Sequence, residues 1–228
     1  MEGIWKARRH SALSHDGVDD YEEVADSASL DITDAIAIEA WVKPLSIRIY
    51  EIFVLKGVSA NNYVYTSRFQ GGGKAEAVIR IGGSYFSIVG NSVWVPGKWY
   101  HAVFTYNSLQ MRWFLNGVED ASPVSQTGNI DSVAQSLKVG GDGIGNYFFN
   151  GLIASIRIYN RALSEAEIKY LYYNPDDPLD TDHLVLWLHP GSIDTDAGYW
   201  WDLSGRDNHG QIFGATKVSL VSPEVTVL

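Results

Sequence analysis

Acidic side chains at alternate strand positions are the first candidates for chemistry in this sequence. A retaining glycosidase needs two carboxyl groups about 5–5.5 Å apart, and a strand supplies them when both occupy one face. Glu22 and Glu23 are adjacent and therefore point to opposite faces. Glu39 is the only acidic residue on its predicted strand, and Glu119 and Asp120 follow a turn. The sequence therefore does not predict a glycosidase.

Other catalytic signatures are also missing from the sequence. It contains no Gly-x-Ser-x-Gly motif of a serine hydrolase, and neither glycine run, 71–73 or 140–143, leads into the Lys-Ser/Thr and helix of a phosphate loop. The six histidines lack the spacing of zinc ligands. His15 and His101 lie on strand patterns, where we expect packing or surface roles. We predict that the chain is not an enzyme.

Glu39 and Arg157 are charged residues on strands whose other members are mostly apolar. A charge on a core strand normally needs a partner, because burying it alone is costly. We expect Glu39 and Arg157 to form a structural ion pair. A role for the same two residues in binding a ligand is the alternative.

Aromatic and amide side chains gather in two predicted loops, near residues 61–63 and 146–148. Sugar recognition uses an aromatic ring against the C–H side of the sugar and amides for its hydroxyl groups. The candidate ligand-binding residues are Asn61, Asn62, Tyr63, Asn146, Tyr147 and Phe148. That these are ordinary loop tips is the alternative.

Composition limits the partners that the chain can have. Its 228 residues are 46% hydrophobic, which is enough for one large β-sandwich. The net charge of −10 argues against nucleic acid, which needs a basic surface. No apolar run reaches the ~18 residues of a membrane span, and no signal peptide is recognisable. The absence of cysteine favours a bacterial, archaeal or viral origin.

Short alternating segments at close spacing predict the strands that position these residues. We expect strands over residues 11–15, 21–24, 36–43, 51–56, 63–69, 75–81, 85–89, 99–106, 111–115, 136–139 and 152–160. Gly82-Gly83 and Asn116-Gly117 are hairpin turns. One helix begins after Ser164, which forms a capping box with Glu167, and it ends before Pro175.

Two runs of sequence carry a family resemblance. Residues 97–117 alternate Trp99, His101 and Val103 against Tyr100, Ala102 and Phe104 and end in Asn-Gly, and residues 149–164 read Phe-Asn-Gly-Leu-Ile-Ala-Ser-Ile-Arg-Ile-Tyr-Asn-Arg-Ala-Leu-Ser. Together they resemble the laminin-G-like, concanavalin A-like lectin/glucanase family. The resemblance implies an all-β fold, a jelly-roll sandwich of two antiparallel sheets, with one short helix near 164–173. It also implies binding at the loops without catalysis.

The segment after Pro175 resembles the part that normally opens such a domain. An acidic linker, 175–182, precedes an apolar strand at 184–188, and an Asp-Leu-Ser-Gly…Asn-His-Gly turn precedes a second strand at 211–215. We therefore expect one domain over 1–228, in which 11–174 is the main body and 183–218 completes the same sandwich in permuted order. Residues 184–188 should pair with 152–160. Alternatively, the segment completes a neighbouring subunit by strand exchange and produces a homo-oligomer.

The resemblance also raises the question of calcium. Many relatives hold one ion between a turn carbonyl near the first Asp-Gly and a carboxylate on the last strand. Asp16, Gly17 and Asp19 can supply oxygen ligands. The last-strand position is Ala154, which removes one ligand, and Asp and Gly also favour simple turns. Calcium is thus the one cofactor that the sequence allows, and none is required.

The functional expectation is a non-catalytic binding or adhesion module that recognises glycans at the sandwich loops. The alternative is a structural virion or surface-assembly protein that uses the jelly roll for protein contacts. We expect a glycan or a protein surface as partner, with no nucleic acid and no membrane insertion. The expected location is extracellular, at a cell surface or on a virion.

Overall fold

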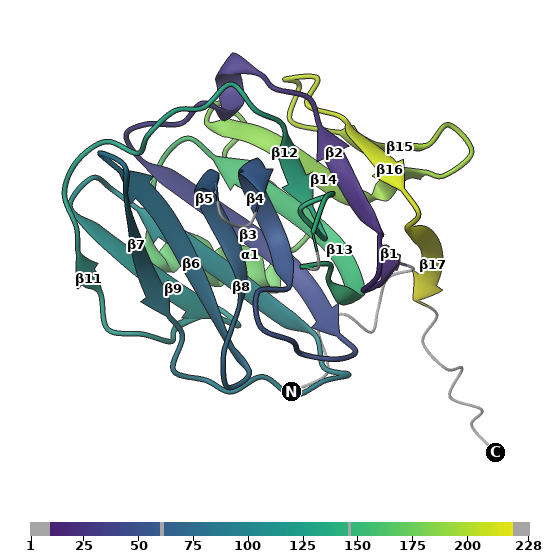
Figure 1. Cartoon of the computed structure of the whole chain (residues 1–228), viewed down its shortest axis with the longest axis horizontal. Helices are drawn as coiled ribbons and strands as arrows, with labels where there is room; N and C mark the ends of the chain where they lie inside the picture. Colours follow the sequence, from purple (N-terminus) through teal and green to yellow (C-terminus); the bar gives the residue numbers. More distant parts are fainter. Residues whose placement is uncertain (1–9, 60–61, 146, 221–228) are drawn as a thin grey trace.

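Alternating apolar residues build two packed antiparallel layers (Figure 1). The computed structural model describes residues 10–59, 62–145 and 147–220. Its strands are β1 (His10–Asp16), β2 (Tyr21–Val24), β3 (Ile36–Pro44), β4 (Ile52–Ser59), β5 (Asn62–Gln70), β6 (Lys74–Ile81), β7 (Ser84–Val89), β8 (Tyr100–Tyr106), β9 (Gln110–Leu115), β10 (Val118–Glu119), β11 (Val124–Ser125), β12 (Leu137–Val139), β13 (Asn150–Tyr159), β14 (Leu184–Asp194), β15 (Tyr199–Asp202), β16 (Gly210–Phe213) and β17 (Thr216–Leu220).

The strand pairings give each layer its order. The first layer runs β17–β1–β13–β3–β8–β9, and β14 lies beside the second half of β13. The second layer runs β15–β16–β2–β12–β4–β5–β6–β7. The pairing of β14 with β15 connects the two layers. Within the described residues this is an all-β sandwich with one α-helix, which is the predicted fold class.

The main core lies between the layers, and β3 is buried on both of its faces. Ile38, Ala40 and Val42 belong to the main core, whereas Ala37 and Trp41 belong to two smaller clusters on the outer side. The helix α1 (Glu165–Tyr173) covers that outer side, behind β3 and β8 in Figure 1. The middle of the first layer, around β3, is therefore covered on both faces.

Local sequence fixes the ends of α1 as predicted. The side chain of Ser164 accepts a hydrogen bond from the backbone N–H of Glu167, and the Glu167 carboxylate accepts one from the backbone N–H of Ser164. This capping box satisfies N–H groups that the first helical turn leaves without partners. Asn174, just before Pro175, is the C-terminal cap.

The strand β14 pairs with β13 as the sequence predicted. Leu188 lies opposite Ile156 and Leu186 opposite Ile158. The strand continues to Asp194, well past the predicted end at residue 188.

The strand predicted over 211–215 is replaced by two strands. Gly214, with φ of +75°, turns the chain between β16, which pairs with β2, and β17, which pairs with β1. A Cβ atom at this position would lie 2.0 Å from Asp20 Oδ1, so only glycine fits. The corner at Gly214 therefore takes the chain from one layer to the other.

Candidate functional site

The outer face of β4–β7 carries a row of aromatic rings. We name it the tyrosine row, and its members are Tyr85, Tyr63, Arg68, Tyr50 and Tyr147. The rings of Tyr85 and Tyr63 lie 4.8 Å apart. The Arg68 guanidinium lies 5.3 Å from the Tyr63 ring centre and 4.5 Å from that of Tyr50, which contacts Tyr147 at 5.8 Å. Segments distant in sequence thus form one continuous row of ring and guanidinium contacts, in which Tyr85 is tilted against Tyr63 and Tyr147 meets Tyr50 edge-on.

A β-bulge in β5 places Tyr63 in this row. Tyr65 lies opposite Lys56 and Tyr63 opposite Gly57, so Val64 is an extra residue between the two pairs. In a regular strand Tyr63 and Tyr65 would share a face, but the bulge leaves Tyr65 in the main core and turns Tyr63 to the outer cluster. A Cβ atom on Gly57 would lie 2.5 Å from the Tyr63 Cα, so the bulge requires glycine here.

Ion pairs and hydrogen bonds fix the row in place. Arg68 Nε donates to Glu76 Oε1 over 2.9 Å across β5 and β6. Burial raises the pKa of Tyr63, so its hydroxyl stays neutral. The ring of Tyr85 is 44% exposed, and the exposed Asn62 accepts a hydrogen bond from Arg80 over 3.1 Å. The row therefore presents the Tyr85 ring to solvent, with the half-buried rings of Tyr50 and Tyr147 at its other end and the Asn62 amide beside it.

The structure brings together only part of the predicted ligand-binding set. Asn62, Tyr63 and Tyr147 lie in or beside the tyrosine row, whereas Asn61 and Asn146 lie outside the described residues. Tyr63 is not a loop tip, because it lies on β5 and is only 4% exposed. Phe148 also differs from the expectation: it is only 6% exposed and packs against Tyr21 with ring centres 6.3 Å apart. Its position in a loop did not reveal that its ring points inward.

The turn predicted as a calcium site brings its three carboxylates together. Oxygen atoms of Asp16, Asp19 and Asp20 lie within 4.8 Å of one another. Two of these side chains accept backbone hydrogen bonds, Asp16 from Val18 and Asp20 from Asp16. Hydrogen bonds of this kind stabilise a turn without any ion.

The Gly17 carbonyl, one of the oxygens predicted to bind calcium, accepts a hydrogen bond from the Arg48 guanidinium over 2.7 Å. The same Arg48 nitrogen donates to the carbonyl of Phe148, and Glu51 balances the charge of Arg48. A cationic side chain thus already occupies one side of the turn. Calcium binding at Asp16, Gly17 and Asp19 stays a prediction.

Glu39 and Arg157 lie opposite each other on β3 and β13. Arg157 Nη1 donates to Glu39 Oε1 over 2.9 Å, both side chains are at most 1% exposed, and the guanidinium lies 4.8 Å from the Trp187 ring centre. Arg157 also donates to the carbonyl of Pro175. These contacts link β3 and β13 to the segment after α1.

Sequence reasoning did not predict that two histidines contact buried carboxylates. His101 Nε2 lies 3.1 Å from Glu39 Oε1, and His15 Nε2 lies 3.0 Å from Glu22 Oε1. Burial alone would lower the pKa of His15, but the Glu22 charge and hydrogen bond raise it. Glu39 lies on the strand beside that of His101, a proximity that the strand patterns alone could not reveal.

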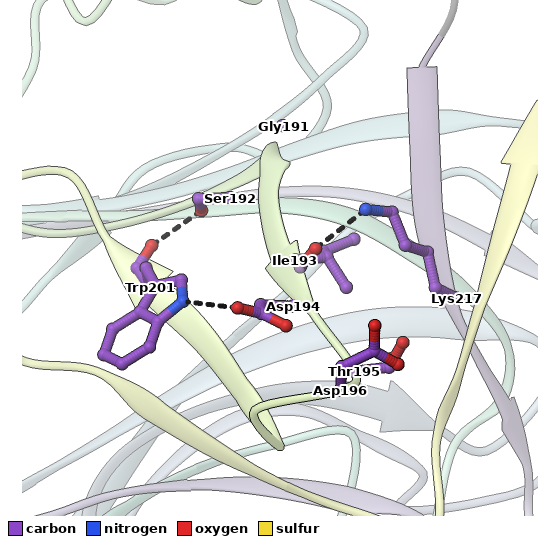
Figure 2. Close-up of a pocket in the computed structure, with 8 residues that line it drawn as sticks. All are labelled: Gly191, Ser192, Ile193, Asp194, Thr195, Asp196, Trp201 and Lys217. Atoms are coloured by element: carbon purple, nitrogen blue, oxygen red, sulfur yellow. Dashed lines mark hydrogen bonds between the residues drawn. The ribbon is translucent and has the colours of Figure 1, made fainter.

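Sequence reasoning also missed a pocket at the end of β14, which is open to solvent (Figure 2). The loops and strands around it supply one exposed indole, two carboxylates, two hydroxyl groups and a lysine. Its lining residues are Gly191, Ser192, Ile193, Asp194, Thr195, Asp196, Trp201 and Lys217. The adjacent residues Trp200 and Trp201 could have indicated an exposed indole here, because neighbouring residues of a strand point to opposite faces.

These features define a lectin-type β-sandwich with an aromatic surface on one sheet. The chain belongs to the concanavalin A-like lectin/glucanases superfamily, in the laminin G family whose model matches residues 16–169. No curated protein matches the chain. Within the described residues, no helix is long and apolar enough to cross a membrane.

Solved structures share the fold at low sequence identity. A candidate carbohydrate-binding protein from Bacteroides ovatus is 18% identical with a TM-score of 0.73, over 95% of this chain and 61% of that protein. The present chain thus spans less than two thirds of that relative. The sialidase CBM40 of Ruminococcus gnavus, solved with α2,3-sialyllactose, is 13% identical with a TM-score of 0.56, over 70% of this chain and 96% of that one. A pentraxin from Limulus polyphemus is 13% identical with a TM-score of 0.55, over 72% and 82%.

Proposed function

We propose that this chain is a non-catalytic glycan-binding module and that the tyrosine row is its binding surface. The observation that carries the proposal is the continuous row of contacts from Tyr85 to Tyr147, with Tyr85 exposed and Asn62 beside it. Membership of a lectin-type family and the carbohydrate-binding relatives support it. In this proposal the chain acts outside the cell or at a surface.

The chemistry of the row suits a saccharide. Sugar rings carry C–H groups on one side and hydroxyl groups around the rim, which match an aromatic face and a neighbouring amide. Arg68 lies between two tyrosine rings and is paired with Glu76, so the rings are held in position before a ligand arrives. Such preorganisation lowers the entropic cost of binding.

The same surface is poorly suited to hydrolysis. The carboxylate of Glu76, beside the row, is engaged by Arg68, whereas a glycosidase needs a free pair of carboxyl groups. The chain as a whole carries a charge of −10, which favours neutral glycans over acidic ones.

A glycan array with neutral plant and microbial oligosaccharides tests the proposal, followed by calorimetric titration of the best binders. Tyr85→Ala should weaken binding roughly 3- to 10-fold, because one aromatic contact is worth about 0.5–1.5 kcal/mol. Tyr173→Ala is the matched control. Tyr173 is also exposed and contacts a second tyrosine, Tyr172, at 5.1 Å, but it belongs to α1.

Failure of every oligosaccharide to bind would overturn the proposal. If Tyr85→Ala instead abolished concentration-dependent self-association measured by light scattering, the assembly function would replace it. Equal losses in Tyr85→Ala and Tyr173→Ala would mean that binding does not depend on the tyrosine row.

A further inference from the structure

The pocket at the end of β14 owes its shape to an irregular pairing with β15. Leu188 lies opposite Asp202 and Ile193 opposite Trp200, so the stretch of β14 between them is longer than the β15 stretch that it faces. Ser192 Oγ donates to the carbonyl of Trp201 over 2.6 Å. The pocket is therefore built into the fold, with a volume of about 340 Å³.

Trp201 supplies the aromatic wall of this pocket. Its side chain is 37% exposed, while its neighbour Trp200 is fully buried in the core. The indole is held by Tyr199, stacked at 5.0 Å, and by the edge of His209 at 4.8 Å. Its Nε1–H donates to Asp194 over 3.4 Å (Figure 2). Tyr199 covers one face of the indole, so a ligand would contact the exposed remainder of a ring that is already held in one orientation.

The remaining wall is polar and offers both acceptors and donors. Hydrogen bonds from the Ala197 N–H and the Trp201 indole lower the pKa of Asp194, which is therefore an ionised acceptor at neutral pH. Asp196 and Thr195 are exposed on the same turn. Lys217 Nζ donates to the carbonyl of Ile193 over 2.7 Å, and an ammonium group has three donors, so it can also serve a ligand.

This combination excludes several occupants. An apolar ligand would find one aromatic wall and otherwise charged groups, whereas apolar sites are lined mainly by hydrophobic side chains. A divalent cation would meet the ammonium of Lys217 beside the carboxylates, and the only three-residue group of potential ligands in the described residues is Asp16, Asp19 and Asp20. An anion would meet two carboxylates.

We infer that this pocket binds one residue of a neutral saccharide, packed against the exposed part of the Trp201 indole and hydrogen-bonded by Asp194, Asp196 and Lys217. The pocket lies beyond the 16–169 segment that the family model matches. Figure 1 shows β17 on the right and β5, β6 and β7 towards the left, and no residue of the tyrosine row lines the pocket, so the two sites are separate. The inference does not depend on the function proposed for that row.

The test uses ¹H–¹⁵N NMR spectra of the full chain, titrated with glucose, galactose, mannose and N-acetylglucosamine. The spectra resolve indole N–H groups, of which the chain has eight. Trp201→Phe removes one resonance and so identifies that of Trp201. We expect at least one neutral sugar to shift this resonance saturably. If none of the four sugars shifts it, the inference is wrong.

Variants then locate the binding. Trp201→Ala should weaken it at least tenfold, Trp201→Phe should retain part of it, and Asp194→Asn should weaken it without unfolding the chain. Leu203→Ala is the control, because Leu203 is exposed and close in sequence but does not line the pocket. Glucuronate should bind more weakly than glucose, because the carboxylates repel it. Wild-type affinity in Trp201→Ala, or tighter binding of glucuronate, would overturn the inference.

Discussion

The two sheets carry the same arrangement of side chains on their outer faces and differ in what covers it. On the first, Arg157 pairs with Glu39 across two strands and lies over Trp187. On the second, Arg68 pairs with Glu76 across two strands and lies over Tyr50 and Tyr63. Arg157 is fully buried, whereas 11% of the Arg68 side chain stays exposed.

The cover decides what each arrangement can do. The segment after α1 closes the first face through the carbonyl of Pro175 and the ring of Trp187, so Arg157 can only stabilise the fold. No helix of the described chain covers the second face, and Tyr85 there is in contact with solvent. The same pair therefore serves only the fold where it is sealed, whereas on the uncovered face it supports a row whose last ring, Tyr85, is exposed.

The largest effect is expected when the segment that covers the first face is removed. Deleting 176–228 removes β14 and leaves the apolar edge of β13 unpaired, which is a site for aggregation. We expect the truncated chain to aggregate or unfold, as judged by light scattering and circular dichroism. A truncated chain that stays monomeric and equally stable would contradict this, and with it the proposal that 183–218 completes the sandwich formed by 11–174.

The sequence predicted the parts of the fold that depend on local patterns. Strands such as β2 and β6 alternate apolar and polar residues or lie between clear turns. The start of the helix could be predicted because Ser164 and Glu167, which form its capping box, lie only three positions apart. The strand β17 was missed because its side chains are mostly exposed, so it has little apolar pattern.

The sites depended on features that no local pattern contains. The bulge at Val64 reverses the expected face of Tyr63, and the register of β4 against β5 sets it. The pocket at Trp201 arises from unequal lengths of β14 and β15. Both are properties of strand pairing between two segments, so neither segment alone predicts them.

Breaking the sealed ion pair should have the second largest effect. Glu39→Ala leaves Arg157 buried without its carboxylate, which should cost about 3–5 kcal/mol of unfolding free energy. Urea denaturation measures it, and Arg157→Met in the Glu39→Ala background is the control, since removing both charges should restore part of the loss. A loss of unfolding free energy below about 1 kcal/mol, the value for an exposed pair, would mean that covering the pair does not increase its contribution to stability.

Lowering the pH should weaken the ion pair of Glu39 and Arg157 without removing any side-chain atoms. Burial alone would raise the pKa of Glu39, but the charge of Arg157 and the hydrogen bonds from His101 and Arg157 lower it below its usual 4.5. A lowered pKa in the folded state gives stability that is present above pH 4.5 and lost as pH falls through the folded pKa. Glu39→Gln should flatten that part of the curve of unfolding free energy against pH. An unchanged slope would contradict this role for Glu39.

The smallest effect on stability is expected at the pair of Arg68 and Glu76, and it is the most direct test of the difference between the two faces. Glu76→Ala removes the carboxylate opposite Arg68, but the guanidinium remains between two tyrosine rings and within reach of water. Because 11% of the Arg68 side chain is exposed, its charge is partly solvated rather than fully stranded, and the cost should be about 1–2 kcal/mol, between the values for surface and buried pairs. Urea denaturation of Glu76→Ala and Glu39→Ala side by side measures the difference, since both variants remove the same atoms from a cross-strand Arg–Glu pair. Equal losses of unfolding free energy in the two variants would show that the contribution of such a pair does not depend on what covers it. Only ligand binding at Tyr85 would then distinguish a binding face from a structural face.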